Sequence, residues 1–160
     1  MSDSVWALTL ATALGCGLAA GVFFSFSAFV MEGLARLPTG QGISAMQSIN
    51  RTAVRPPLLI ALFGTAVLCL GLAVWALTSS GGRPGAWLLA GGGLYLVGVI
   101  GVTIGLNVPL NDELAALDPE SAEAAGGWAH YQASWIRWNH LRGAAALAAA
   151  AAFSAAPATA

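Results

Sequence analysis

Charge is what this chain of 160 residues most lacks: 8% of its residues are charged, whereas 58% are hydrophobic. Soluble domains carry about 25% charged residues. The few charges are clustered and leave long uncharged gaps, which run from Asp3 to Glu32, from Arg55 to Arg83, from Arg83 to Asp112, and from Arg142 onward. Each gap is close to the ~20 residues that an apolar helix needs to cross a bilayer. The composition therefore excludes an ordinary soluble domain and indicates a membrane protein.

Other absences each remove a class of function. The net charge of -1 leaves no basic patch, which excludes nucleic acid as a partner. The chain has no HExxH, CxxC or P-loop motif and no GxGxxG after a strand, so zinc-protease, ATP-binding and dinucleotide-binding functions have no support. Cys16 and Cys69 lie in apolar blocks, where we expect small buried thiols and no disulfide. The amino-terminal segment lacks the positive charges of a cleavable signal, so we expect it to form the first span.

The long apolar blocks predict an all-α fold, a four-helix transmembrane bundle that forms one membrane domain over residues 1–160. The expected spans are about residues 5–30, 58–77, 87–108 and 135–156. The purely apolar part of the last span is too short to cross alone, so its helix must include Trp135, Asn139 and Arg142. In the third span, Gly101 and Gly105 form a GxxxG pattern, which marks close helix packing and permits a homo-oligomer.

The arginines indicate how the bundle is oriented. With four spans, the termini and Arg83 share one side of the membrane, and the other side carries Arg36, Arg51, Arg55, Arg137 and Arg142. Cytoplasmic loops are rich in positive residues. Loop 1 (residues 32–57) and loop 3 (residues 112–127) are therefore predicted to be cytoplasmic.

The most unusual stretch is WAHYQASWIRWNHLR, from Trp128 to Arg142, which holds three tryptophans and both histidines. At ~100° per residue, a single helical stripe collects aromatic and polar side chains. Its members are Trp128, Tyr131, Trp135, Trp138, Asn139 and Arg142. An aromatic wall with an amide and a guanidinium in it resembles the lining of a site.

The predicted topology brings further polar residues to the same end of the bundle. They are Glu32, Gln47, Asn50, Arg51, Asn107, Asn111 and Asp112. A polar cap over an apolar cavity is the expected form of a small-molecule site. The same residues are also compatible with an ordinary polar interface and its aromatic belt. Asn107 and Asn111, which follow Thr103 at intervals of four, can instead cap the end of the third helix.

His140 has three interpretations from the sequence. It lies about 100° from Asn139 around the helix and can serve as a general base, as a metal or haem ligand, or as a structural histidine. A metal site needs at least three ligands close together. His140, Glu32 and Asp112 are candidates, but no spacing in the sequence requires them to meet. We therefore predict no metal and no other cofactor, and leave a metal ion open as an alternative.

Four ordered motifs resemble the anthrone oxygenase-like family of small integral membrane proteins: FFSFSAFVMEGLARLP, MQSINR, NVPLNDEL and WxxWNHLR. The resemblance extends from Phe23 to Arg142. It implies a four-helix membrane fold and an oxidoreductase that converts an anthrone to an anthraquinone with dioxygen. The bilayer and a small apolar aromatic molecule would then be its partners.

This chemistry needs a base, donors for an enolate oxygen and a flat apolar slot. The resemblance suggests His140 as the base, with Asn139, Asn111 and Arg142 as donors. Further residues would bind the substrate, namely Trp135 and Trp138 by stacking and Asn107, Asn50, Glu32 and Asp112 around them. Two alternatives remain: a metal-dependent oxygenase using His140 and Glu32, and a non-catalytic binding or transport protein for apolar aromatic compounds.

Overall fold

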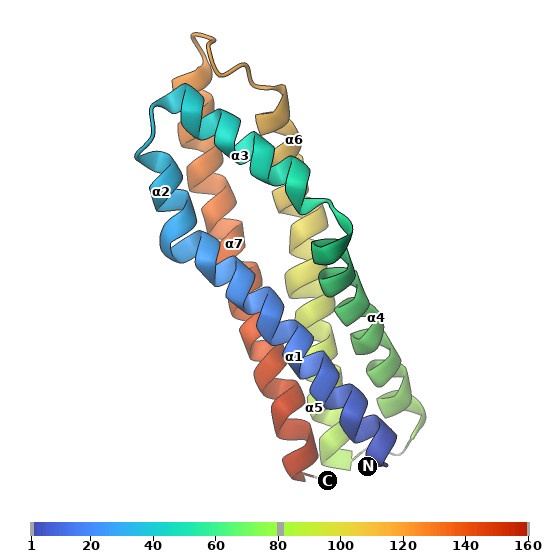
Figure 1. Ribbon diagram of the computed structural model, residues 1–160. Helices are drawn as coiled ribbons and strands as arrows, with labels where there is room; N and C mark the ends of the chain where they lie inside the picture. Colours follow the sequence, from blue (N-terminus) through green and yellow to red (C-terminus); the bar gives the residue numbers. More distant parts are fainter. Residues whose placement is uncertain (1, 80–81, 160) are drawn as a thin grey trace.

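The computed structural model describes residues 2–79 and 82–159, and within them it contains helices and turns but no strand. Four helical stretches of this part are long and apolar enough to cross a membrane: Asp3–Ala35, Pro56–Thr78, Gly82–Ala116 and Ala124–Thr159. They form an up-and-down bundle with both termini at one end (Figure 1). The predicted all-α, four-helix transmembrane fold is confirmed.

The first half of the chain forms a long span, a crossing helix and a second span. The first span consists of α1 (Asp3–Ser25), a π-helical segment η1 (Phe26–Val30) and α2 (Met31–Ala35). Helix α3 (Thr39–Ala53) lies across the end of the bundle away from the termini, and α4 (Pro56–Thr78) returns as the second span (Figure 1). Two prolines open α4, where the first turn needs no amide donors.

The second half forms two longer helical stretches. The third span runs through α5 (Gly82–Gly93), two π-helical segments, η2 (Leu94–Gly101) and η3 (Thr103–Asn107), and α6 (Val108–Ala116). The fourth consists of α7 (Ala124–Ala155) and a final 3₁₀ turn, η4 (Ala156–Thr159).

The third and fourth spans extend beyond their predicted ends. Helix α6 continues through Pro109, although proline inside an α-helix clashes with the carbonyl four residues earlier. Pro109 lies in the first turn of α6, directly after the π-helical segment η3, and proline is tolerated in a first turn. Helix α7 begins at Ala124, so the aromatic stripe belongs to its first half.

Two apolar cores stabilise the bundle. The core near the termini joins all four spans through small and aromatic residues, among them Cys16, Cys69, Tyr95, Ala146 and Phe153. The other core lies beneath α3 and includes Met31, Ile43, Met46, Leu114, Trp128 and Trp135. Gln47 fastens α3 to α6, because its Nε2 donates to the carbonyls of Leu114 at 2.9 Å and Leu117 at 3.0 Å.

Small residues bring α7 against its neighbours. A Cβ at Gly98 would lie 2.5 Å from the Cβ of Ala145 on α7, so no larger residue fits there without movement. The glycines of the GxxxG pattern, Gly101 and Gly105, are both exposed. A Cβ at Gly105 would meet nothing within 4 Å. Within the chain, Gly98 therefore makes the close contact, and the GxxxG pattern faces outward.

Candidate functional site

A cavity of about 180 Å³ lies inside the bundle, beneath α3 and beside the two cores. It is bounded by α1, η1, α3, α4, η3, α6 and α7, which span nearly the whole chain. Its polar lining comes from Asn50, Thr103, Asn111, Trp135 and Arg142. The rest is apolar: Val22, Phe23, Phe26, Ile49, Ala53, Val54, Leu58, Leu59, Leu62, Phe63, Ile104 and Val108. Two of the described π-helical segments, η1 and η3, contribute to this wall, and such segments occur frequently at functional sites.

Helix α7 presents the predicted stripe to the interior. Five of the six predicted members are buried, namely Trp128, Tyr131, Trp135, Asn139 and Arg142, whereas Trp138 is half-buried. Trp128 stacks on Tyr131, with ring centroids 5.6 Å apart, and the Trp135 ring lies 5.4 Å from that of Phe26. Trp135 and Phe26 both line the cavity, so they give it an aromatic wall.

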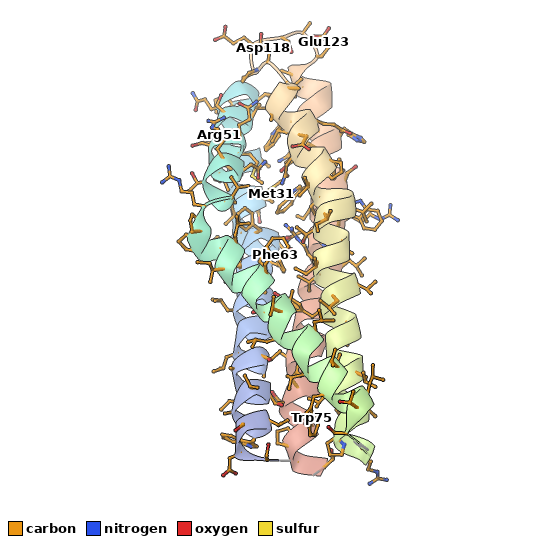
Figure 2. The ribbon with its side chains drawn as sticks, turned by 90° about the vertical axis from the view of Figure 1, so that its right-hand side faces the viewer. Met31, Arg51, Phe63, Trp75, Asp118 and Glu123 are labelled. Carbon is orange, nitrogen blue, oxygen red and sulfur yellow. The ribbon has the colours of Figure 1, made fainter. Side chains whose placement is uncertain are left out.

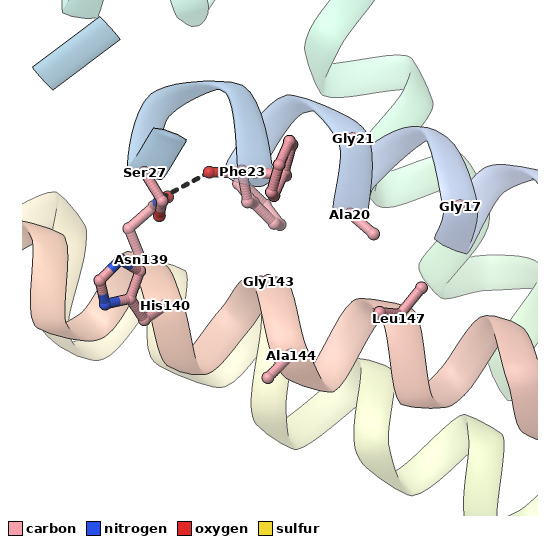
Figure 3. A pocket seen from close by; sticks show the side chains of 11 residues that line it. Gly17, Ala20, Gly21, Phe23, Ser27, Asn139, His140, Gly143, Ala144 and Leu147 are labelled. Atoms are coloured by element: carbon pink, nitrogen blue, oxygen red, sulfur yellow. Dashed lines mark hydrogen bonds between the residues drawn. The ribbon is translucent and has the colours of Figure 1, made fainter. Parts of the chain in front are cut away.

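Asn139 is fully engaged in joining α7 to α1. Its Nδ2 donates to the Phe23 carbonyl at 2.7 Å and to the Ser27 hydroxyl at 2.8 Å. Figure 3 shows Asn139 directed toward this part of α1. Its Oδ1 accepts from Nε of Arg142 at 3.0 Å. An amide with both donors and its oxygen engaged has little capacity left for a ligand. Asn139 therefore positions Arg142.

Arg142 is a buried cation without an anionic partner in the described part of the chain. Its side chain is 8% exposed, and the ion pair found among residues 2–79 and 82–159 joins Arg36 to Glu32 instead. The guanidinium carbon lies 4.3 Å from the centroid of the Phe23 ring and 5.0 Å from that of Trp135, and Nη1 donates to the Thr103 hydroxyl at 3.4 Å. A buried charge normally requires a partner, and the open side of Arg142 faces the cavity.

Asn111 is oriented by two donors from α7. Its Oδ1 accepts from the Trp135 indole at 2.9 Å and from the Tyr131 hydroxyl at 3.0 Å. The Tyr131 oxygen in turn accepts from Nδ2 of Asn50 at 3.4 Å. Because both donors hold the amide oxygen, the NH₂ group of Asn111 is left for the cavity. The polar wall thus offers a guanidinium and an amide NH₂, both of which are donors.

The donors and the apolar walls together define the ligand that the cavity suits. Its lining includes neither a carboxylate nor a histidine. A flat apolar molecule bearing an oxygen that is negative, or becomes negative, is complementary to this arrangement.

A comparison with protein families identifies the family of the chain. A model of the anthrone oxygenase family matches residues 58–152. The chain belongs to this family. No curated protein and no solved structure matched the chain. The anthrone oxygenase match contains nearly all of the second span, the third span and most of the fourth, and thus Asn111, Trp135, Asn139 and Arg142.

The other substrate-binding residues that were predicted from the sequence lie outside the cavity lining of this anthrone oxygenase family member. Asn107 is wholly buried, and its Nδ2 donates to the Trp135 carbonyl at 3.3 Å, so it supports the wall from behind. Trp138 is half-buried, with the Arg137 guanidinium 5.2 Å from its ring centroid. Asp112 is exposed. Glu32 is exposed and paired with Arg36, as the interpretation of an interfacial carboxylate expects.

His140 also lies elsewhere. It is exposed and lines an outer groove of about 440 Å³ between α1 and α7, together with Gly17, Gly21, Phe24, Gly143 and Leu147 (Figure 3). Its assignment as a base stays a prediction. In the described ranges no three His, Cys, Asp or Glu residues lie close enough together to hold a metal ion, so the donor set that the metal-dependent alternative needs is not assembled there.

Sequence reasoning did not select Tyr131 or Phe23 as site residues. Tyr131 connects Asn50 to Asn111, and its place on the aromatic stripe was the signal that pointed to it. Phe23 contributes a carbonyl to Asn139 and a ring to Arg142. A phenylalanine in an apolar run has no sequence feature that distinguishes it from its neighbours.

Proposed function

We propose that this chain is a membrane oxygenase that converts an anthrone-type substrate to the corresponding quinone with dioxygen. The observation that carries the proposal is Arg142: a buried guanidinium without a carboxylate partner among the described residues, facing a cavity with apolar, partly aromatic walls. The enolate of an anthrone matches both features. Its negative oxygen would pair with the guanidinium, and its flat apolar ring system would fill the space between the apolar walls.

The reaction needs three changes at one carbon of the substrate. Loss of a proton from the methylene carbon opposite the carbonyl gives an enolate, whose carbon transfers electrons to dioxygen and forms a carbon–oxygen bond. Protonation of the resulting peroxide gives a hydroperoxide. Loss of the remaining hydrogen from that carbon, with cleavage of the oxygen–oxygen bond, gives a second carbonyl and water. One oxygen atom of dioxygen ends in the quinone and the other in water, so the equation balances without a further reductant.

The cavity residues act mainly on the first change. Arg142 and the NH₂ group of Asn111 donate to the enolate oxygen, which lowers the free energy of the anion and makes the substrate C–H more acidic. Removing one such donor typically lowers kcat by about 10²–10³. Trp135 and Phe26 form the aromatic wall of the cavity, and they would pack against the rings of the substrate.

The proton leaves the substrate by one of two routes that experiment can separate. In our proposal it passes to water, because stabilisation by Arg142 makes a strong base unnecessary. The alternative base is His140, whose ring lies in the outer groove and outside the cavity lining. A general base must come within hydrogen-bond reach of the proton that it removes.

The test is turnover by the purified full chain in phosphatidylcholine vesicles. Anthrone is added under a metal chelator, and oxygen uptake and anthraquinone absorbance are recorded together. We expect equal amounts of oxygen consumed and quinone formed, with no hydrogen peroxide released. Protein-free vesicles give the background rate of oxidation in air. A rate no higher than this background would exclude the proposed reaction, and saturable binding of anthrone without oxygen uptake would favour a binding protein.

A further inference from the structure

The cavity opens on one side, between the second and third spans. Five of its lining side chains are among the exposed large hydrophobic residues. Val54 directly follows α3, and the other four lie on the second and third spans: Leu59 and Phe63 on α4, Ile104 on η3 and Val108 on α6. A side chain that both lines a cavity and reaches the surface marks an opening. We call the opening bounded by these four residues the lateral mouth.

The lateral mouth results from the path of α4. This helix packs mainly against α1, α5 and η2. Figure 2 shows α4 beside the third span near Trp75 and well apart from it near Phe63. The separation falls at the level of η3 and α6, where Ile104 and Val108 lie. The cavity that Arg142 and Asn111 line therefore reaches the surface at this level, through exposed residues of both spans.

The lateral mouth lies within spans that are apolar enough to cross a membrane. Its four residues carry no polar side-chain atom, and apolar residues that are still more exposed continue along both spans, such as Val67 on α4 and Val97 on η2. Such a surface faces lipid hydrocarbon in a membrane span. An opening in it communicates with the bilayer interior.

The cavity is too small to enclose a molecule of three fused rings, so part of such a molecule would occupy the lateral mouth. An apolar cavity of about 150 Å³ holds one benzene ring, and this cavity measures about 180 Å³. A molecule of three fused rings therefore fills the cavity with its oxygen-bearing part and extends into the mouth. Phe63 and Ile104 would contact the outer ring.

We propose that the lateral mouth admits and holds a flat, uncharged polycyclic aromatic molecule taken directly from the bilayer hydrocarbon. The proposal rests on the proposed function only for the identity of the reacting substrate, since the mouth is defined by the shape and exposure of its residues. Its consequence is selectivity for apolar aromatic compounds that dissolve in the membrane.

One experiment tests occupancy of the mouth without turnover. The full chain in phosphatidylcholine vesicles is photolabelled with 2-azidoanthracene, and labelled residues are located by mass spectrometry. We expect labelling at Phe63 and Ile104 that excess anthracene suppresses. Val97 lies on the same span and is 73% exposed but does not line the cavity, so its labelling should not respond to anthracene. Equal responses at Ile104 and Val97 would overturn the proposal.

A second experiment tests passage through the mouth. Ile104→Phe should lower kcat/KM for anthrone by about tenfold, because the larger side chain would narrow the lateral mouth. Val97→Phe is the matched control and should leave kcat/KM unchanged.

A further variant tests another way into the cavity. Ser48→Phe would obstruct a different hollow, beside α3, which shares Phe26, Ile49 and Ala53 with the cavity. A loss with Ser48→Phe and none with Ile104→Phe would reject the lateral mouth. Competable labelling in a protein that takes up no oxygen with anthrone would reject the proposed reaction and retain the mouth.

Discussion

Replacing Arg142 by methionine is the sharpest test of the proposed chemistry, because it should separate activity from stability. Arg142 is 8% exposed and lacks a carboxylate partner in the described residues, so folding buries a charge that only hydrogen bonds and aromatic rings stabilise. Methionine has a similar length, is apolar and adapts to irregular space. The substitution removes the charge while keeping most of the volume.

The expected effect on turnover follows from the donor that is lost. Arg142 would donate to the developing enolate oxygen, and loss of one such donor lowers kcat by about 10²–10³. The expected effect on stability is small. Replacing buried ionic groups by apolar residues is often neutral or stabilising. The substitution also leaves Asn139 Oδ1 without its Arg142 donor, which costs about 1–3 kcal/mol. The free energy gained by not burying the charge offsets this cost.

The measurement combines oxygen uptake with anthrone and a thermal unfolding curve, both on the full chain in the same vesicles. Arg137→Gln is the matched control, because Arg137 lies on the same helix, is exposed and is outside the cavity lining. It should leave both quantities unchanged. An Arg142→Met variant that folds and turns over anthrone at the rate of the unmodified chain would refute the assignment of Arg142 to the enolate.

Three other substitutions test the framework of the site. Asn139→Ala should lower the free energy of unfolding, measured by chemical denaturation, by about 1–3 kcal/mol for each buried partner left without a hydrogen bond. Ser27→Ala removes only one of the acceptors of Asn139 and should lower the free energy of unfolding less in the same assay. His140→Ala should retain anthrone turnover, because the ring is exposed and outside the cavity lining; a loss of about 10²-fold would instead establish it as the base. Gly98→Ala should destabilise the bundle by about 1–3 kcal/mol through overpacking, whereas Gly105→Ala, with open space around its Cβ, should not; equal melting temperatures for the two would contradict the close contact.

Much of the fold follows from local sequence features. The uncharged gaps predict the four helices that are long and apolar enough to cross a bilayer, because unpaired charges are unfavourable in hydrocarbon and a helix satisfies its own backbone there. The stripe from Trp128 to Arg142 follows from helical periodicity and is buried as expected. No local feature of the sequence indicated the π-helical segments η1 and η3.

The candidate site was only partly predictable. Asn111, Trp135, Asn50 and Arg142 were selected from the sequence and line one cavity. Residue type alone could not show that the amide of Asn139 is fully engaged by Phe23, Ser27 and Arg142. His140, one position further along the helix, turns about 100° away from Asn139 and faces the outer groove.

The sequence by itself therefore determined which four stretches form helices long and apolar enough to cross a membrane, which face of the last helix is buried, and to which family the chain belongs. These properties depend on composition, helical periodicity and short motifs, which can be read from each segment without knowing how the segments pack together. The tertiary structure alone decided which polar groups face the cavity, that Arg142 has no carboxylate beside it in the described residues, and that α4 leaves the third span near Phe63. These depend on the angles at which helices cross, and those angles are set by packing between segments far apart in the chain.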